Sequence, residues 1–384
     1  MGTSKKIVTI IGARPQIIKS AAISRVVRDS FLDQLEEVVI HTGQHYDENM
    51  SDLFFKEMNI PEPKYNLGIG SDSHGIQTAK MLIALESLLQ MEKPDAVIVY
   101  GDTNSTIAGA LSAAKLNIPV IHIEAGLRSF NKQMPEEINR ISSDHMSTML
   151  FTPTEQGAIN LKNEGFLFDD QKPISIDNPV IYHCGDIMYD NSLYFSEVSD
   201  QRSTILEDLR LEKERFILCT IHRDTNTDNA EKLNEIFEAL YEIQKFSLLT
   251  LVIPLHPRTK SKLKKNLSDE MFREFFSNQR IKLIDPVGYL DVIALEKNAK
   301  LVITDSGGLQ KEAYFFKKPC IILRAQTEWV EIVENGNAIL TDTDKVRIVK
   351  AFNDLTQKRD FSYPPIFGDG KAAYFICSQI MNIL

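Results

Sequence analysis

Short apolar runs alternate with helical patterns along almost the whole chain. This alternation constrains the fold more than any other feature, because continuous runs rich in Val and Ile, joined through helices, are typical of parallel sheets covered on both faces. We therefore expect an α/β protein built from doubly wound sheets of the Rossmann kind. The runs that predict strands lie at residues 6–11, 38–41, 96–100, 119–123, 149–151, 180–184, 216–221, 249–253, 281–284, 301–304 and 320–323.

The length of the chain predicts two such domains. A single hydrophobic core usually stops growing at ~250–300 residues, and this chain has 384. We place the join within residues 186–199, which gives a first domain of residues 1–190 and a second of residues 191–367. An amphipathic segment at residues 368–384 follows a proline-rich break and is expected to pack back on the first domain as a helix.

The composition argues against several classes of function. A net charge of -10 disfavours nucleic acid as a partner, although a local cluster of Arg and Lys can still bind a small anion. No apolar run approaches the ~20 residues of a membrane span, and no signal peptide is visible, so we expect a cytoplasmic protein. The four cysteines form no C-x-x-C pair and the eight histidines no ligand cluster, which predicts reduced core thiols and no metal site.

Open parallel sheets bind ligands beyond the carboxyl ends of their strands, so the loops that follow strands are the places to seek chemistry. With two domains of this kind, the cleft between them is the expected site. Neither half carries G-x-G-x-x-G after its first strand, which argues against a dinucleotide cofactor.

The turn after the first predicted strand is a candidate phosphate site. Gly12 permits a tight turn and Pro15 suits the start of a helix. Arg14 lies in the turn and Lys19 one helical turn after Pro15, so both cations can converge near a helix N-terminus, which itself attracts anions. The alternative is a solvated surface turn with two ordinary cations.

A second candidate follows the predicted strand at residues 301–304. The backbone N–H groups of Ser306, Gly307 and Gly308 stand at a helix start, where they are expected to be free to bind a pyrophosphate. Glu312 lies further into the helix and can accept hydrogen bonds from the two hydroxyls of a ribose. The alternative is an ordinary N-cap formed by Ser306, with Glu312 solvated.

Carboxylates and a histidine follow other predicted strands. Asp102 and Glu124 each come directly after an apolar run, and Glu136 opens a later helix. Simpler explanations remain open. Asp102 can be a helix cap, Glu124 can form an ion pair with Arg128, and Glu136 can interact favourably with the helix dipole. His222 ends a strand of the second half, where a phosphate-binding or acid/base role fits it; His256 is placed similarly but less decisively.

These segments occur together, and in the same order, in the UDP-N-acetylglucosamine 2-epimerase family, which the chain resembles over essentially its whole length. The resemblance implies a glycosyltransferase-B-like fold, a UDP-sugar substrate, a homodimer, and catalysis without nicotinamide or metal. It implies a catalytic set comprising Asp102, Glu124, Glu136 and His222. It implies UDP-sugar contacts from Arg14, Lys19, Ser306, Gly307, Gly308 and Glu312. The segments that carry it are 12–19, 101–103, 124–128, 135–140, 222–223 and 305–308.

Departures from the common family motifs indicate a branch. Ala13 and Gln16 stand in the first motif where G-T-R-P-E is common, and Trp329-Val330-Glu331 replaces a common R-P-E segment. These variants resemble the branch that acts on UDP-2,3-diacetamido-2,3-dideoxy-glucuronic acid for bacterial surface polysaccharides. Tyr46-Asp47 stands where substrate-regulated members usually have an arginine, so we do not expect allosteric activation by substrate. The alternatives are a UDP-N-acetylglucosamine 2-epimerase, a hydrolysing relative, a glycosyltransferase of the same fold and a non-catalytic binding module.

Overall fold

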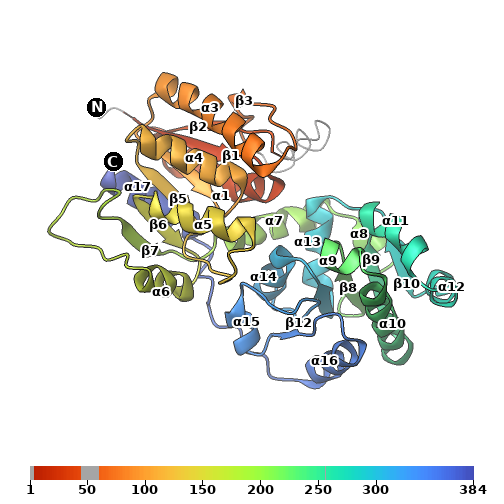
Figure 1. Cartoon of the computed structure of the whole chain (residues 1–384). Coiled ribbons are helices and arrows are strands. Elements are labelled where there is room, and N and C mark those ends of the chain that lie inside the picture. Colours follow the sequence, from red (N-terminus) through yellow and green to blue (C-terminus); the bar gives the residue numbers. More distant parts are fainter. Residues whose placement is uncertain (1–3, 45–59, 256) are drawn as a thin grey trace. The chain divides into compact units, whose positions relative to one another are not determined.

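The computed structural model describes residues 4–44, 60–255 and 257–384. The chain divides into two compact units (Figure 1). Unit 1 comprises Met1–Asn191 together with Pro365–Leu384, and unit 2 comprises Ser192–Pro364. Helix α7 (Ile187–Arg202) begins in unit 1 and ends in unit 2.

Unit 1 is built on a parallel sheet of seven strands among the described residues, in the order β3-β2-β1-β4-β5-β6-β7. The central strands are wholly buried because helices cover both faces, and every residue of β4 is inaccessible to solvent. The strands are β1 (Lys5–Ile11), β2 (Leu35–His41), β3 (Tyr65–Asn66), β4 (Ala96–Tyr100), β5 (Val120–Ile123), β6 (Met149–Thr152) and β7 (Val180–His183).

The helices of unit 1 follow its strands, and the last of them comes from the far end of the chain. This helix, α17, lies beside the strands of unit 1 and packs on α1, where the rings of Phe31 and Tyr374 are 5.5 Å apart (Figure 1). Asp190 accepts hydrogen bonds from the backbone N–H groups of Ala372 (3.1 Å) and Ala373 (2.8 Å) and so caps α17. The helices are α1 (Arg14–Ser30), α3 (His74–Glu92), α4 (Asn104–Lys115), α5 (Pro135–His145), α6 (Glu155–Asn163) and α17 (Ala372–Ile383).

Unit 2 has a six-stranded parallel sheet among the described residues, in the order β10-β9-β8-β11-β12-β13. Its strands are β8 (Phe216–Thr220), β9 (Thr250–Pro254), β10 (Ile281–Ile284), β11 (Leu301–Thr304), β12 (Cys320–Ile322) and β13 (Ala338–Leu340). Its helices are α8 (Ile205–Asp208), α9 (Asp224–Thr227), α10 (Ala230–Ser247), α11 (Pro257–Asn266), α12 (Asp269–Ser277), α13 (Tyr289–Asn298), α14 (Gly307–Phe315), α15 (Val330–Glu334) and α16 (Lys345–Gln357).

The prediction of two doubly wound parallel sheets is confirmed. Strands β3 and β13 were not predicted, since runs of two and three residues carry too little periodicity to be distinguished from loop. Among the described residues, no helix combines the length and the apolar character that crossing a bilayer requires. The four cysteines are unbridged, as expected.

Both sheets have the same switch in strand order. In unit 1 the chain moves outward from β1 to one side and then crosses to β4 on the other side, and in unit 2 it does the same at β8 and β11. Ligands of open α/β sheets bind at the carboxyl ends of the strands at such a switch point. The loops that follow β1 and β4 in unit 1, and β8 and β11 in unit 2, are therefore the structurally favoured sites.

Candidate active site

Gln16 ties the first strand-end loop of unit 1 to the second. Its side chain is buried, with Oε1 accepting from the backbone N–H groups of Gly12 (2.9 Å) and Ala13 (3.1 Å). Its Nε2 donates to the carbonyl of Tyr100 (2.8 Å) and to Oγ1 of Thr106 (3.0 Å). Since both amide atoms of Gln16 are bonded inside the protein, this side chain has a structural role that joins the two loops.

Lys19 and Glu124 form an ion pair at the carboxyl edge of the sheet. Gly101 lies against this pair: a Cβ at this position would stand 3.1 Å from Oε2 of Glu124 and 3.3 Å from Nζ of Lys19. The sequence predicted that Lys19 binds a diphosphate, whereas in this structure it lies among carboxylates. The ion pair also excludes the alternative in which Arg128 is the partner of Glu124.

The backbone at Glu124 is strained. Its φ of 72° lies in the left-handed region, which a side chain other than glycine rarely adopts. Two hydrogen bonds hold the backbone in this conformation. The N–H groups of Glu124 and Ala125 both donate to the carbonyl of Phe151, at 3.1 and 3.0 Å. A strained residue that carries a carboxylate at a sheet switch point is typical of a functional site.

Asp102 is paired with Arg140, which reaches it from helix α5. The same guanidinium donates to Oε2 of Glu137 at 2.6 Å, and Asn139 donates to the backbone carbonyl of Asp102 at 3.0 Å. Side-chain exposure is 31% for Asp102 and 5% for Arg140, so the carboxylate faces solvent while its partner is buried. The Asp102 residue is thus held by Arg140 and Asn139, and its carboxylate keeps a surface that a ligand can reach.

The two glutamates of the first turn of α5 have different positions. Glu137 is buried and accepts hydrogen bonds from the backbone N–H groups of Ser129 (3.0 Å) and Phe130 (2.9 Å), which makes it a structural residue. Glu136 is exposed and lies near enough to Asp102 to raise the pKa of that carboxyl by charge repulsion. The predicted catalytic residue of this pair is therefore the one with access to a ligand.

Burial raises the pKa of Asp102 above its ordinary value, and the negative charges of Glu124 and Glu136 act in the same direction. Arg140 and Lys19 oppose this shift by stabilising the charged form. A carboxyl whose pKa is raised is better suited to give and take a proton during a reaction.

Arg140→Gln is expected to move the Asp102 limb of the pH profile of kcat/KM to higher pH. The substitution removes a cation that lowers the pKa of Asp102, so protonation begins at a higher pH than in the wild type. Arg140→Lys keeps the charge and serves as the control, with a limb close to that of the wild type. A downward shift in Arg140→Gln, or equal shifts in both variants, would contradict the pairing.

In unit 2, Asp305 holds the loop that carries His222. The carboxylate is inaccessible to solvent and accepts from the backbone N–H groups of His222 (3.1 Å) and Arg223 (3.0 Å) and from Nδ2 of Asn226 (3.2 Å). Nδ1 of His222 lies 3.3 Å from Oδ1 of Asp305, and the His222 side chain is 44% exposed. The imidazole is thus oriented by a buried carboxylate and presented to solvent at the end of β8.

The loop after β11 differs from its prediction in one respect. The N–H of Ser306 is not free, because it donates to Oγ1 of Thr304 at 2.9 Å. The Ser306 hydroxyl caps α14 through the N–H of Leu309. Gly307 and Gly308 form the first helical positions, whose N–H groups have no carbonyl partner within the helix. The predicted anion site is thereby reduced to these two amides and the helix terminus.

Charged groups gather around Gly307. A Cβ at this position would lie 3.8 Å from NH1 of Arg324 and 4.0 Å from NH2 of Arg223. Arg324 is held by a two-point ion pair with Glu328, with both nitrogen–oxygen distances at 2.9 Å. Two guanidinium groups beside a helix N-terminus make this part of unit 2 suitable for a multiply charged anion.

Trp329 packs against the same loop. Its indole N–H donates to the carbonyl of Gly307 at 3.1 Å, and Nζ of Lys311 lies 4.1 Å from the ring centroid. Glu312 is buried, and the hydroxyl of Tyr289 lies 3.4 Å from its Oε1. The segment at residues 329–331 is therefore in contact with the predicted phosphate loop through Trp329, whereas Glu312 has only a small accessible area.

Several residues that the structure places at these loops were not among the predicted site residues. Arg140, Arg223 and Asp305 stand inside the motifs but had no predicted role, and Arg324 lies outside them. The sequence signal that could have identified these residues is their position, since each follows or faces the end of a strand. Of the predicted binding residues, Arg14 is exposed at the start of α1. His256 and Tyr46-Asp47 lie outside the described residues.

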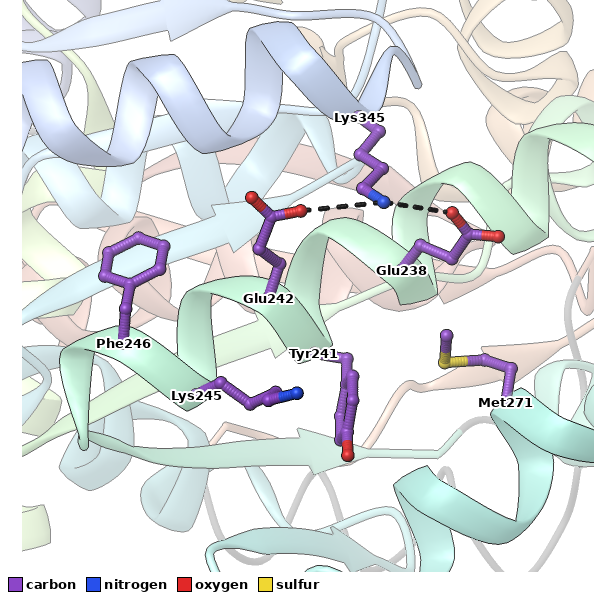
Figure 2. Close-up of a pocket in the computed structure, with 7 residues that line it drawn as sticks. All are labelled: Glu238, Tyr241, Glu242, Lys245, Phe246, Met271 and Lys345. Carbon is purple, nitrogen blue, oxygen red and sulfur yellow. Dashed lines mark hydrogen bonds and ion pairs between the residues drawn. The ribbon is translucent and has the colours of Figure 1, made fainter.

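One pocket on unit 2 lies apart from these loops. Figure 2 shows that its residues come from helices α10, α12 and α16, with Lys345 between Glu238 (3.2 Å) and Glu242 (3.5 Å). Tyr241, Phe246 and Met271 add apolar surface, and no residue of a strand-end loop takes part. In the described part of the chain, no group of three or more His, Cys, Asp or Glu side chains is arranged to hold a metal ion.

Comparison with known proteins gives consistent matches over nearly the full chain. A family model described as UDP-N-acetylglucosamine 2-epimerase matches residues 31–381. A protein of Methanococcus maripaludis named UDP-N-acetylglucosamine 2-epimerase homolog is 48% identical, over 98% of this chain and 100% of its own. A UDP-2,3-diacetamido-2,3-dideoxy-D-glucuronate 2-epimerase of Pseudomonas aeruginosa is 44% identical, with the same coverage.

The fold has a close counterpart among solved structures. A UDP-N-acetylglucosamine 2-epimerase of Methanocaldococcus jannaschii, crystallised with UDP-N-acetylglucosamine and UDP, superposes with a TM-score of 0.84. The two chains are 43% identical, and the match covers 98% of this chain and 99% of the other.

Proposed function

Because the chain belongs to the UDP-N-acetylglucosamine 2-epimerase family, we propose that it inverts C2 of UDP-2,3-diacetamido-2,3-dideoxy-D-glucuronate to give the manno epimer. It is an isomerase of the UDP-sugar 2-epimerase class, with the two Rossmann-like units of a glycosyltransferase-B-like fold. The observation that carries the proposal is the pair of fixed carboxylates, Asp102 and Glu124, at the switch point of the sheet in unit 1.

The chemistry requires more than a single base. The proton on C2 of a 2-acetamido sugar is not next to a carbonyl and is barely acidic. Breaking the C1–O bond first changes this, because the electron pair leaves with UDP and C1 becomes oxocarbenium-like. Loss of the C2 proton then forms a C1–C2 double bond, which gives a glycal and UDP. Re-addition of the UDP oxygen to C1, with a proton delivered to the other face of C2, completes the inversion without net loss of any atom.

The residues of unit 1 are suited to the proton transfers and to the positive charge at C1. Asp102, Glu124 and Glu136 are the proposed acid/base groups, and each such contact typically contributes ~10²–10⁴-fold. Lys19 and Arg140 keep two of these carboxylates paired in the absence of ligand.

The residues of unit 2 are suited to the nucleotide. We assign the departing diphosphate to the amides of Gly307 and Gly308, aided by His222, and keep Arg14 of unit 1 as a proposed contact of the UDP-sugar. Positive groups and helix N-termini at developing negative charge are an effective form of transition-state stabilisation. Ser306 takes part through its hydroxyl as the cap of this helix, and Glu312 is the proposed ribose contact.

The choice of sugar depends on the segment at residues 329–331. Trp329 contacts the carbonyl of Gly307, so the branch-specific change is adjacent to the proposed diphosphate site. UDP-N-acetylglucosamine is the second candidate, favoured by the Methanocaldococcus jannaschii enzyme that was crystallised with it. The homodimer stays a prediction from the resemblance, and the cytoplasmic location stays a prediction from the sequence.

Incubation with each candidate sugar nucleotide in D₂O tests the proposal. We expect deuterium at C2 of the recovered sugar and an equilibrium mixture of two epimers, with faster turnover of the diacetamido-uronate. Recovered sugar without deuterium at C2 would overturn the epimerase mechanism. Faster turnover of UDP-N-acetylglucosamine would overturn only the choice of substrate.

The same reaction mixture separates the alternatives. A hydrolysing relative would accumulate free UDP and free sugar at long times. A glycosyltransferase would need an acceptor and would leave the C2 proton in place.

A further inference from the structure

His122 stands in the middle of an apolar strand, where its two ring nitrogens have different partners. The side chain is inaccessible to solvent. Its Nδ1 lies 2.7 Å from Oδ1 of Asp144, which is also fully buried, on helix α5. Its Nε2 lies 2.8 Å from the backbone carbonyl oxygen of Gly101. A buried histidine with two such short contacts is a defined hydrogen-bonding group, although no step of the proposed reaction uses it.

The partners determine which nitrogens carry protons. A backbone carbonyl can only accept, so Nε2 of His122 must donate to Gly101. Asp144 also accepts from NH1 of Arg128 at 2.7 Å and from the N–H of Gly126 at 3.2 Å, both through Oδ2. The guanidinium of Arg128 is permanently charged and contacts this carboxylate, which favours the ionised form of Asp144. Asp144 is therefore an ionised acceptor, and Nδ1 must donate as well.

This arrangement connects two loops at the carboxyl edge of the sheet. Gly101 directly precedes Asp102, so the bond from Nε2 fixes the peptide from which this carboxylate projects. Gly126 follows Glu124 by two residues, and its N–H is held by the carboxylate that pairs with Nδ1. The hydrogen bonds therefore connect the Asp102 loop, through the His122 imidazole and the Asp144 carboxylate, to the Glu124 loop.

We propose that His122, as a doubly protonated imidazolium bonded to Asp144, is a positioning residue that fixes the Asp102 loop relative to the Glu124 loop. The inference rests on the proposed function, to which it adds the group that sets the spacing of the two carboxylates. Misplacement of a reacting group by ~1 Å can cost ~10²-fold in rate. Loss of His122 is therefore expected to lower kcat more than it weakens substrate affinity.

Two substitutions separate the two bonds. Asn at position 122 places an amide nitrogen near the position of Nδ1 and keeps the bond to Asp144, but it releases the Gly101 carbonyl. Gln reaches the position of Nε2 and keeps the bond to Gly101. We expect His122→Asn to lower kcat by ~10²-fold with little change in KM, and His122→Gln to lose less. His183→Asn, at the exposed end of β7, is the matched control and should match the wild type.

Two further measurements do not depend on turnover. With ¹⁵N-labelled histidine, the His122 signals, assigned by their loss in His122→Gln, should show a proton on both ring nitrogens at pH 7. Hydrogen exchange of the peptide that contains residues 101–103 should be faster in His122→Asn than in the wild type, and unchanged in His183→Asn.

The outcomes distinguish this inference from the proposed function. Absence of UDP-sugar epimerisation in the wild type would overturn the function, while the ring protons and the exchange rates would still decide the role of His122. One unprotonated ring nitrogen in the wild type would overturn the inference, and this result does not require any variant to fold. An active wild type together with wild-type kcat in His122→Asn would overturn it as well.

Discussion

Asp102→Asn is expected to lower kcat by ~10²–10⁴-fold, the range typical for loss of a positioned acid/base group. An amide of the same size cannot take up the proton. It also removes the charge that Arg140 neutralises, so that buried guanidinium loses one ion pair and keeps the one to Glu137. Initial rates of epimerisation give kcat, and calorimetric titration with UDP gives the affinity. Because the diphosphate is assigned to residues of unit 2, UDP affinity should change far less than kcat.

Asp33→Asn is the matched control for this substitution. Asp33 is an exposed residue between α1 and β2, so the same chemical change there should leave kcat and UDP affinity as they are in the wild type. A kcat of Asp102→Asn within tenfold of the wild type would remove Asp102 from the proposed acid/base groups. A parallel loss of UDP affinity would assign it to binding instead.

Gly126→Ala is expected to be among the most destabilising single substitutions in unit 1. Its φ of 77° lies in the left-handed region, where an L side chain costs about 1–2 kcal/mol. A Cβ there would also stand 2.3 Å from the carbonyl oxygen of Gly157, which belongs to the backbone of α6 and cannot rotate away. Overpacking of this kind adds about 1–3 kcal/mol. Activity should fall too, because Gly126 is two residues from Glu124.

Gly165→Ala isolates the steric part of this effect. Gly165 also has a positive φ, 94°, but a Cβ there would meet no atom within 4 Å. It should therefore carry only the conformational cost of about 1–2 kcal/mol. Urea denaturation followed by far-UV circular dichroism compares the two variants with the wild type. Equal losses in both would mean that the backbone of α6 moves away and that the close approach to Gly157 is not a constraint.

Long periodic segments were predictable, and so was the architecture that they build. The apolar runs at β1, β4, β8 and β11 are buried on both faces, and such strands have few alternatives to a parallel sheet. Short edge strands such as β13 were missed, because three residues that pair with a single neighbour carry no periodic pattern. The positions of Asp102, Glu124 and His222 at strand ends also follow from the sequence, since the loop after a strand is fixed once the strand is.

The partners of these residues did not follow from the sequence. Arg128 is four residues from Glu124, which made it the natural ionic partner, yet it pairs with Asp144 and with Glu164 at 2.7 Å. Glu124 pairs with Lys19, more than a hundred residues away in the chain. Which ion pair forms depends on where the fold places each side chain, and here the carboxylate of Glu124 meets Lys19 on α1.

The two kinds of information have different physical origins. By itself the sequence determined the α/β class, the parallel sheets, the loops that carry polar groups and the resemblance to an epimerase family, because periodicity and motif order are local properties of the chain. Only the tertiary structure decided that Gln16 is buried, that the Ser306 N–H is engaged, and that His122 joins two loops. The Ser306 N–H bonds Thr304, two residues away, but the other two depend on atoms that β4 and α5 bring together from distant positions in the chain.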